Sequence, residues 1–110
     1  MKIENVPFTV TDWARIFPTE HPGALGSSFW KMVETGNVRL RIVEYSPAFT
    51  SDHSCPRGHV MLVLAGELLV KLADGSEHML LPGMSFHASD DEKNPHVVSS
   101  PRGARVFIVD

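Results

Sequence analysis

The stretch Val60–Gly83, with the sequence VMLVLAGELLVKLADGSEHMLLPG, decides the fold of this chain. Its branched apolar residues form two runs, Val60–Leu64 and Glu67–Leu72, which have the length of strands rather than of helices. Asp74-Gly75 follows as a tight hairpin turn, because glycine tolerates the positive φ that such turns need. His78–Leu81 then provides the returning strand. The stretch therefore predicts short β-strands joined by tight turns.

Short strands also account for most of the sequence on either side of this stretch. Val38–Tyr45 alternates apolar residues with a second face that carries Arg39, Arg41 and Tyr45. Further strands are expected at Ser28–Val33, Met84–Ala88, His96–Ser99 and Arg105–Val109. Helical character is confined to one or two turns in Thr11–Phe17, which end at Pro18. The whole pattern predicts an all-β sandwich or barrel.

Length and composition limit the classes of protein that this chain can represent. Its 110 residues suit a single domain spanning residues 1–110. The net charge is −3 and no basic cluster occurs, so a nucleic-acid partner is not expected. The longest apolar run is too short to cross a bilayer and the N-terminus lacks a signal peptide, so no membrane partner is expected. The single cysteine favours a reducing cytoplasm.

Three side chains that can bind a transition metal precede the apolar stretch. His53, Cys55 and His59 are two and four residues apart, so an extended chain would direct them to one face. The same parity continues along the apolar positions Met61, Val63 and Ala65, which are expected to point inward. His96, stiffened by Pro95, is expected to supply a fourth ligand.

Thiolate and imidazole together suit a divalent transition metal better than magnesium or calcium. Zinc is favoured, with iron, nickel, manganese and copper as alternatives. The plainer interpretation is that each histidine is an ordinary surface or core residue and that Cys55 is a small buried apolar residue.

The chain resembles the cupins, which are small jelly-roll β-barrels. Pro82-Gly83, the hairpin from Gly66-Glu67 to Asp74-Gly75 and the late Pro95-His96 carry this resemblance. His53 and Cys55 stand where the first cupin motif has two histidines. His59 stands at its carboxylate position, and six residues separate it from Gly66.

More narrowly, the chain resembles the DHCW-motif cupin-fold family over nearly its whole length. The residues that carry the likeness are Lys2–Asn5, Phe8, Asp12-Trp13, Pro18–His21, Val43–Pro47, Asp52-His53, Cys55, Gly58-His59, Gly66-Glu67, Pro82–Ser85 and Phe107–Asp110. This resemblance implies a jelly-roll fold and a metal site, and it names no substrate. The loop before His96 lacks the proline and glycine usual in cupins, so His87 is an alternative ligand.

Three functions fit these features, and the sequence leaves open whether the chain is an enzyme. The first is a metal-dependent enzyme on a small molecule, with a pocket formed by Tyr45, Arg41, Glu20, His21 and Met61. The second is a non-catalytic binding or sensing module with a closed metal site. The third is a metal-free jelly roll that acts through its dimer surface. A homodimer is expected because pairing can cover exposed strand edges and because cupins commonly pair.

Overall fold

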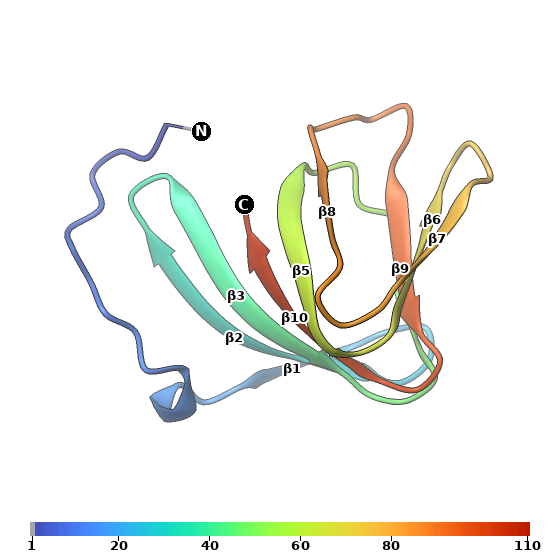
Figure 1. Cartoon of the computed structure of the whole chain (residues 1–110), viewed down its shortest axis with the longest axis horizontal. Helices are drawn as coiled ribbons and strands as arrows, with labels where there is room; N and C mark the ends of the chain where they lie inside the picture. The colour runs from blue at the N-terminus through green and yellow to red at the C-terminus, as the bar shows by residue number, and fades with distance from the viewer. Residues whose placement is uncertain (1) are drawn as a thin grey trace.

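The computed structural model describes residues 2–110, which form two antiparallel sheets that face each other (Figure 1). The larger sheet has the order β1 (Thr19–Pro22), β2 (Ser27–Thr35), β3 (Val38–Tyr45), β10 (Ala104–Val109), β5 (His59–Gly66) and β8 (Ser85–Ala88). The smaller sheet has the order β4 (Phe49–Thr50), β9 (His96–Ser100), β6 (Leu68–Leu72) and β7 (Glu77–Leu80). The predicted all-β fold class is confirmed.

Helical structure among the described residues is limited to one short turn. The expected helical segment near Thr11–Phe17 contains only the 3-10 turn η1 (Trp13–Arg15), where the Asp12 carboxylate accepts a hydrogen bond from Ala14 N at 3.1 Å. None of the helices in residues 2–110 is long and apolar enough to cross a membrane.

The hairpin predicted at Asp74-Gly75 joins β6 to β7. Gly75 has a φ of +91°, which a residue with a side chain rarely adopts, and Leu72 N donates to Ser76 O at 3.0 Å across the turn. The returning strand is β7, one residue earlier at each end than expected. This hairpin supplies the smaller sheet with the apolar residues that face the larger one.

The core lies between the two sheets and draws on both. Val63 and Val106 of the larger sheet are 1% and 0% exposed, and Leu68 of the smaller sheet is 0% exposed. Burying each such side chain contributes about 1.5–3 kcal/mol, so this core holds the two sheets together.

The inward alternation predicted for β5 is right at Met61 and Val63 but wrong at Ala65. Met61 and Val63 are 2% and 1% exposed, whereas Ala65 is exposed. The pairing of β5 with β10 shifts register between Val63 and Ala65, so Leu64 is an extra residue. A β-bulge of this kind reverses the alternation of faces, and the period-two pattern could not indicate it.

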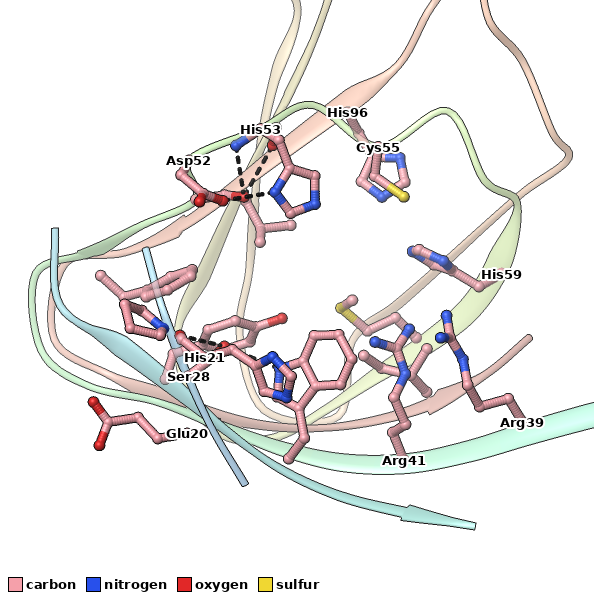
Figure 2. Close-up of a pocket in the computed structure, with 18 residues that line it drawn as sticks. Glu20, His21, Ser28, Arg39, Arg41, Asp52, His53, Cys55, His59 and His96 are labelled. Atoms are coloured by element: carbon pink, nitrogen blue, oxygen red, sulfur yellow. Dashed lines mark hydrogen bonds and ion pairs between the residues drawn. The ribbon is translucent and has the colours of Figure 1, made fainter. Parts of the chain in front are cut away.

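On β3 the alternation and the bounds are both as predicted. The face that carries Arg39, Arg41 and Tyr45 is the one that lines the space between the sheets, at the end where β5 and β9 begin (Figure 2). Arg41 is only 7% exposed. Burial of a cation is uncommon without a partner, so this strand places an unusual group near the interior.

Candidate functional site

The structure brings together three of the four predicted metal ligands. The ligand atoms of Cys55, His59 and His96 all lie within 4.8 Å of one another. His59 begins β5 in the larger sheet and His96 begins β9 in the smaller sheet, while Cys55 comes from the loop ahead of β5 (Figure 2). We call these three residues the Cys–His–His group.

Backbone hydrogen bonds fix Cys55 beside His96. Cys55 N donates to His96 O at 2.7 Å, and His96 N donates to Cys55 O at 3.0 Å, which forms an isolated antiparallel bridge. Cys55 is a free thiol of intermediate exposure. This partial exposure at a cavity wall suits a ligand better than the alternative of a small buried apolar residue.

His59 lacks the partners that a buried imidazole normally has. Its side chain is 5% exposed, and neither Nδ1 nor Nε2 makes a hydrogen bond within residues 2–110. Each buried nitrogen without a partner costs about 1–3 kcal/mol. Either nitrogen can bind a metal ion through its lone pair, so the residues present fit a bound metal.

Burial also keeps the two imidazoles of the group neutral. Burial, with a smaller contribution from the neighbouring His96, lowers the pKa of His59 to about 4. Burial likewise lowers the pKa of His96. Only the neutral ring binds metal, so at neutral pH these two side chains need lose no proton first.

The structure does not bring His53 into the Cys–His–His group. Its Nδ1 lies 2.6 Å from Asp52 Oδ1, and its side chain is 73% exposed. The loop between Ser51 and Gly58 is not an extended strand, so sequence parity does not set the direction of its side chains. His53 lines the same cavity as the group, and its role as a ligand stays a prediction.

The alternative ligand His87 also lies outside the group. It sits on β8 opposite Val60, is exposed, and lines a second cavity of about 380 Å³. His78 is exposed on β7, as an ordinary surface histidine would be.

The Cys–His–His group opens onto a cavity of about 500 Å³. All five residues predicted for a pocket line this cavity: Glu20, His21, Arg41, Tyr45 and Met61. Burial raises the pKa of Tyr45 to about 12, so its hydroxyl stays protonated and can donate a hydrogen bond. The volume is in the range of small-molecule sites.

An aromatic stack forms part of the cavity wall. The His21 ring stacks on the Trp30 ring at 4.0 Å between centroids, and Trp30 Nε1 donates to Ser28 Oγ at 2.9 Å. Arg41 Cζ lies 4.6 Å from the Trp30 ring centroid. No sequence pattern indicates that Trp30 lies beside Arg41.

A buried carboxylate behind the cavity, that of Asp110, was not predicted from the sequence. The side chain of Asp110 is 1% exposed and accepts hydrogen bonds from Arg39 Nε at 2.9 Å, Arg39 Nη2 at 2.8 Å and Arg41 Nη2 at 3.1 Å. Arg57 Nε lies 3.5 Å away and His59 Nδ1 lies 3.8 Å away. Burial raises the pKa of Asp110, but the Arg39 hydrogen bond and the arginine charges outweigh burial and hold it below its ordinary value.

One sequence pattern predicts part of this cluster of Asp110 with its arginines. Arg39 and Arg41 share a face of β3, which places both guanidinium groups at one site. Nothing local to Asp110 predicts that it meets them, because the contact forms only when β10 pairs with β3.

Comparison with known proteins identifies the fold. No protein-family model matches the sequence, and neither does any curated protein. Among solved structures, a sugar phosphate isomerase from a cupin superfamily of Silicibacter pomeroyi is 18% identical with a TM-score of 0.71, over 92% of this chain and 74% of that one. A protein described as a predicted oxalate decarboxylase from Thermotoga maritima is 12% identical with a TM-score of 0.77, over 92% and 96%.

A third similar structure is the iron(II) form of the protein HppE with an alternative substrate. It is 13% identical with a TM-score of 0.75, over 94% of this chain and 60% of that one. At such low identities the likeness concerns the fold. The chain therefore has the cupin jelly-roll fold that its sequence predicted.

Proposed function

We propose that this chain is a metal-dependent enzyme that acts on a small molecule, with Cys55, His59 and His96 as metal ligands. The observation that carries the proposal is the position of the Cys–His–His group on the wall of a cavity of about 500 Å³. Three protein ligands leave a coordination position for water or substrate, which is typical of catalytic rather than structural sites.

Zinc is the metal that this ligand set favours. One thiolate and two imidazoles suit zinc well, and the same donors accept iron, nickel, manganese or copper. When bound, such a metal polarises a carbonyl oxygen or lowers the pKa of a water molecule. A reducing cytoplasm, which the single cysteine predicts, would keep Cys55 free to bind. The resemblance to the DHCW-motif family supports a metal site and adds no reaction.

The remaining cavity residues would bind and orient the substrate. Tyr45 offers a protonated hydroxyl, since its pKa is raised to about 12 by burial. Arg41 offers a cation on the same wall, and His21 with Trp30 offers a flat aromatic surface. None of them is assigned as a general base.

A second function, a closed metal-binding module, is favoured by one observation. His53 lines the same cavity as the Cys–His–His group, and Figure 2 shows it close to Cys55 on the same loop. A fourth protein ligand would fill the position that an enzyme needs open, which suits a structural or sensing role.

Cobalt(II) substitution separates the two functions, because its visible spectrum reports coordination and that of zinc does not. The protein is prepared without a histidine tag, loaded with cobalt(II), and titrated with azide. An open position predicts one bound cobalt and a spectral change with azide. A closed site predicts no response to azide in the native protein and a response in His53→Ala. Failure to bind cobalt, zinc or iron would refute both functions and leave a metal-free jelly roll.

We also propose that the protein is a homodimer. The segment before η1 is tied to the β2–β3 turn, where Glu4 N donates to Asn37 Oδ1 at 2.8 Å. Phe8 of this segment is nevertheless 96% exposed, and Phe17, which follows η1, is 92% exposed. Large apolar side chains on an ordered segment favour cover by a second copy of the chain.

A further inference from the structure

We propose that the cavity beside the Cys–His–His group binds a small carboxylic acid, and that Arg41 is the residue that pairs with its carboxylate. The inference extends the proposed function, on which it rests for the role of the metal site. It starts from Arg41, whose side chain is 8% exposed and lines the cavity, and whose Nε has no hydrogen-bond partner within residues 2–110.

The charges around Arg41 do not balance. Three guanidinium groups, those of Arg39, Arg41 and Arg57, lie near the single carboxylate of Asp110. Arg39 donates two hydrogen bonds to this carboxylate, whereas Arg41 donates only one, from Nη2 at 3.1 Å. Arg57 is 55% exposed and is solvated. Arg41 is therefore the buried cation that lacks a full counter-charge, and buried charges in proteins are normally paired.

The surroundings of Arg41 suit a planar anion. Its Cζ lies 4.6 Å from the Trp30 ring centroid, a contact that helps to hold the guanidinium in place. A guanidinium binds a carboxylate through two parallel N–H bonds. Nε and Nη2 of Arg41 form such an edge, in which Nε has no partner and Nη2 also donates to Asp110. A phosphate dianion would call for a second free cation, and Arg39 already gives Nε and Nη2 to Asp110.

The position of Arg41 also limits the size of the acid. Asp110 Oδ2 lies 3.1 Å from Arg41 Nη2 and 3.8 Å from His59 Nδ1, so Arg41 and His59 lie on either side of one carboxylate. Both side chains also line the cavity (Figure 2). A short acid with an oxygen function beside its carboxylate would reach both. This geometry points to the class of 2-hydroxy and 2-oxo acids.

The experiment follows the Nε–H resonance of Arg41 by nuclear magnetic resonance while lactate or pyruvate is added. Metal-free and zinc-loaded protein are both titrated, with lactamide, phosphoglycolate and sodium chloride of equal ionic strength as comparisons. We expect a saturable shift with lactate or pyruvate and none with lactamide or chloride. Zinc should tighten the binding at least several-fold. A shift no larger than that caused by chloride overturns the inference, and a preference for phosphoglycolate shows that the site is a phosphate site instead.

Matched variants assign the effect to Arg41. Arg41→Gln should weaken lactate binding about tenfold or more, and Arg41→Lys should restore little because it lacks the two-pronged edge. Arg57→Gln, which changes an exposed arginine near the same carboxylate, should bind as the native protein does. Equal weakening in Arg57→Gln would contradict the role of Arg41. If Arg41→Gln does not fold, the resonance of the native protein still decides the question.

The outcomes keep the two proposals distinct. Carboxylate binding at Arg41 that is the same with and without metal supports the anion site and counts against the enzyme function. Metal binding with no carboxylate effect leaves the metal site standing and refutes this inference.

Discussion

Metal-free protein should lose stability between pH 7 and pH 5 through His59. Burial lowers the pKa of His59 from 6.5 to about 4 in the folded state. In the unfolded chain the ring titrates near its ordinary pKa, so below pH 6.5 the unfolded state binds the proton first. The stabilising contribution is therefore fully present above pH 6.5 and is lost as the pH falls toward 4.

The size of the effect follows from the two pKa values. A fall from 6.5 to about 4 corresponds to ~3 kcal/mol of unfolding free energy, of which ~2 kcal/mol is lost between pH 7 and pH 5. This interval lies above the ordinary pKa values of aspartate and glutamate side chains, and the pKa of Asp110 is held below its ordinary value.

The assay is urea unfolding of chelator-treated protein at the two pH values, with native protein, His59→Gln and His78→Gln. Native protein and His78→Gln should each lose ~2 kcal/mol more than His59→Gln, since His78 is exposed on β7 and the contribution of His96 is common to all three proteins. If native protein and His59→Gln lose the same stability, the imidazole of His59 is not held neutral by burial.

Three further predictions concern the metal, the buried carboxylate and the dimer. Cys55→Ser should lose most of its metal affinity, and the native thiol should react slowly with alkylating reagents until a chelator is added. Cys55 would not be a ligand if the thiol reacts fast with or without chelator and the variant keeps its full metal content. Asp110→Asn should destabilise the protein by about 3–5 kcal/mol, because it leaves Arg39 and Arg41 buried without their counter-charge; an unchanged urea midpoint would contradict that reasoning. Replacing Phe8 and Phe17 together by Ser should convert a dimer into a monomer by light scattering, and a dimer that survives the change must use another surface.

The fold followed from short-range patterns that the structure reproduces. The alternation over Val38–Tyr45 gave β3 with its observed bounds, and Asp74-Gly75 gave the β6–β7 hairpin. Ala65 was placed on the wrong face because the extra residue at Leu64 is a property of the pairing between β5 and β10. A register shift between strands far apart in sequence leaves no mark in the period of either strand.

Two of the ligands were predictable because they begin strands, whereas Cys55 and His53 share a loop, and only Cys55 is held beside His96 by backbone hydrogen bonds. His59 and His96 begin β5 and β9, so their positions follow from the strands. His53 lies in a loop without strand geometry, and its ring turns to Asp52. Asp110 meets Arg39 only through the pairing of β10 with β3, a contact between residues 71 positions apart.

The most direct test of the central claim is X-ray absorption spectroscopy of the untagged protein loaded with one equivalent of zinc. Binding through Cys55, His59 and His96 predicts one sulfur at about 2.3 Å and two imidazole nitrogens at about 2.0–2.1 Å, with a light non-protein atom in the fourth position. A zinc shell without sulfur, or with fewer than two imidazoles, would contradict the claim that these three residues form the metal site.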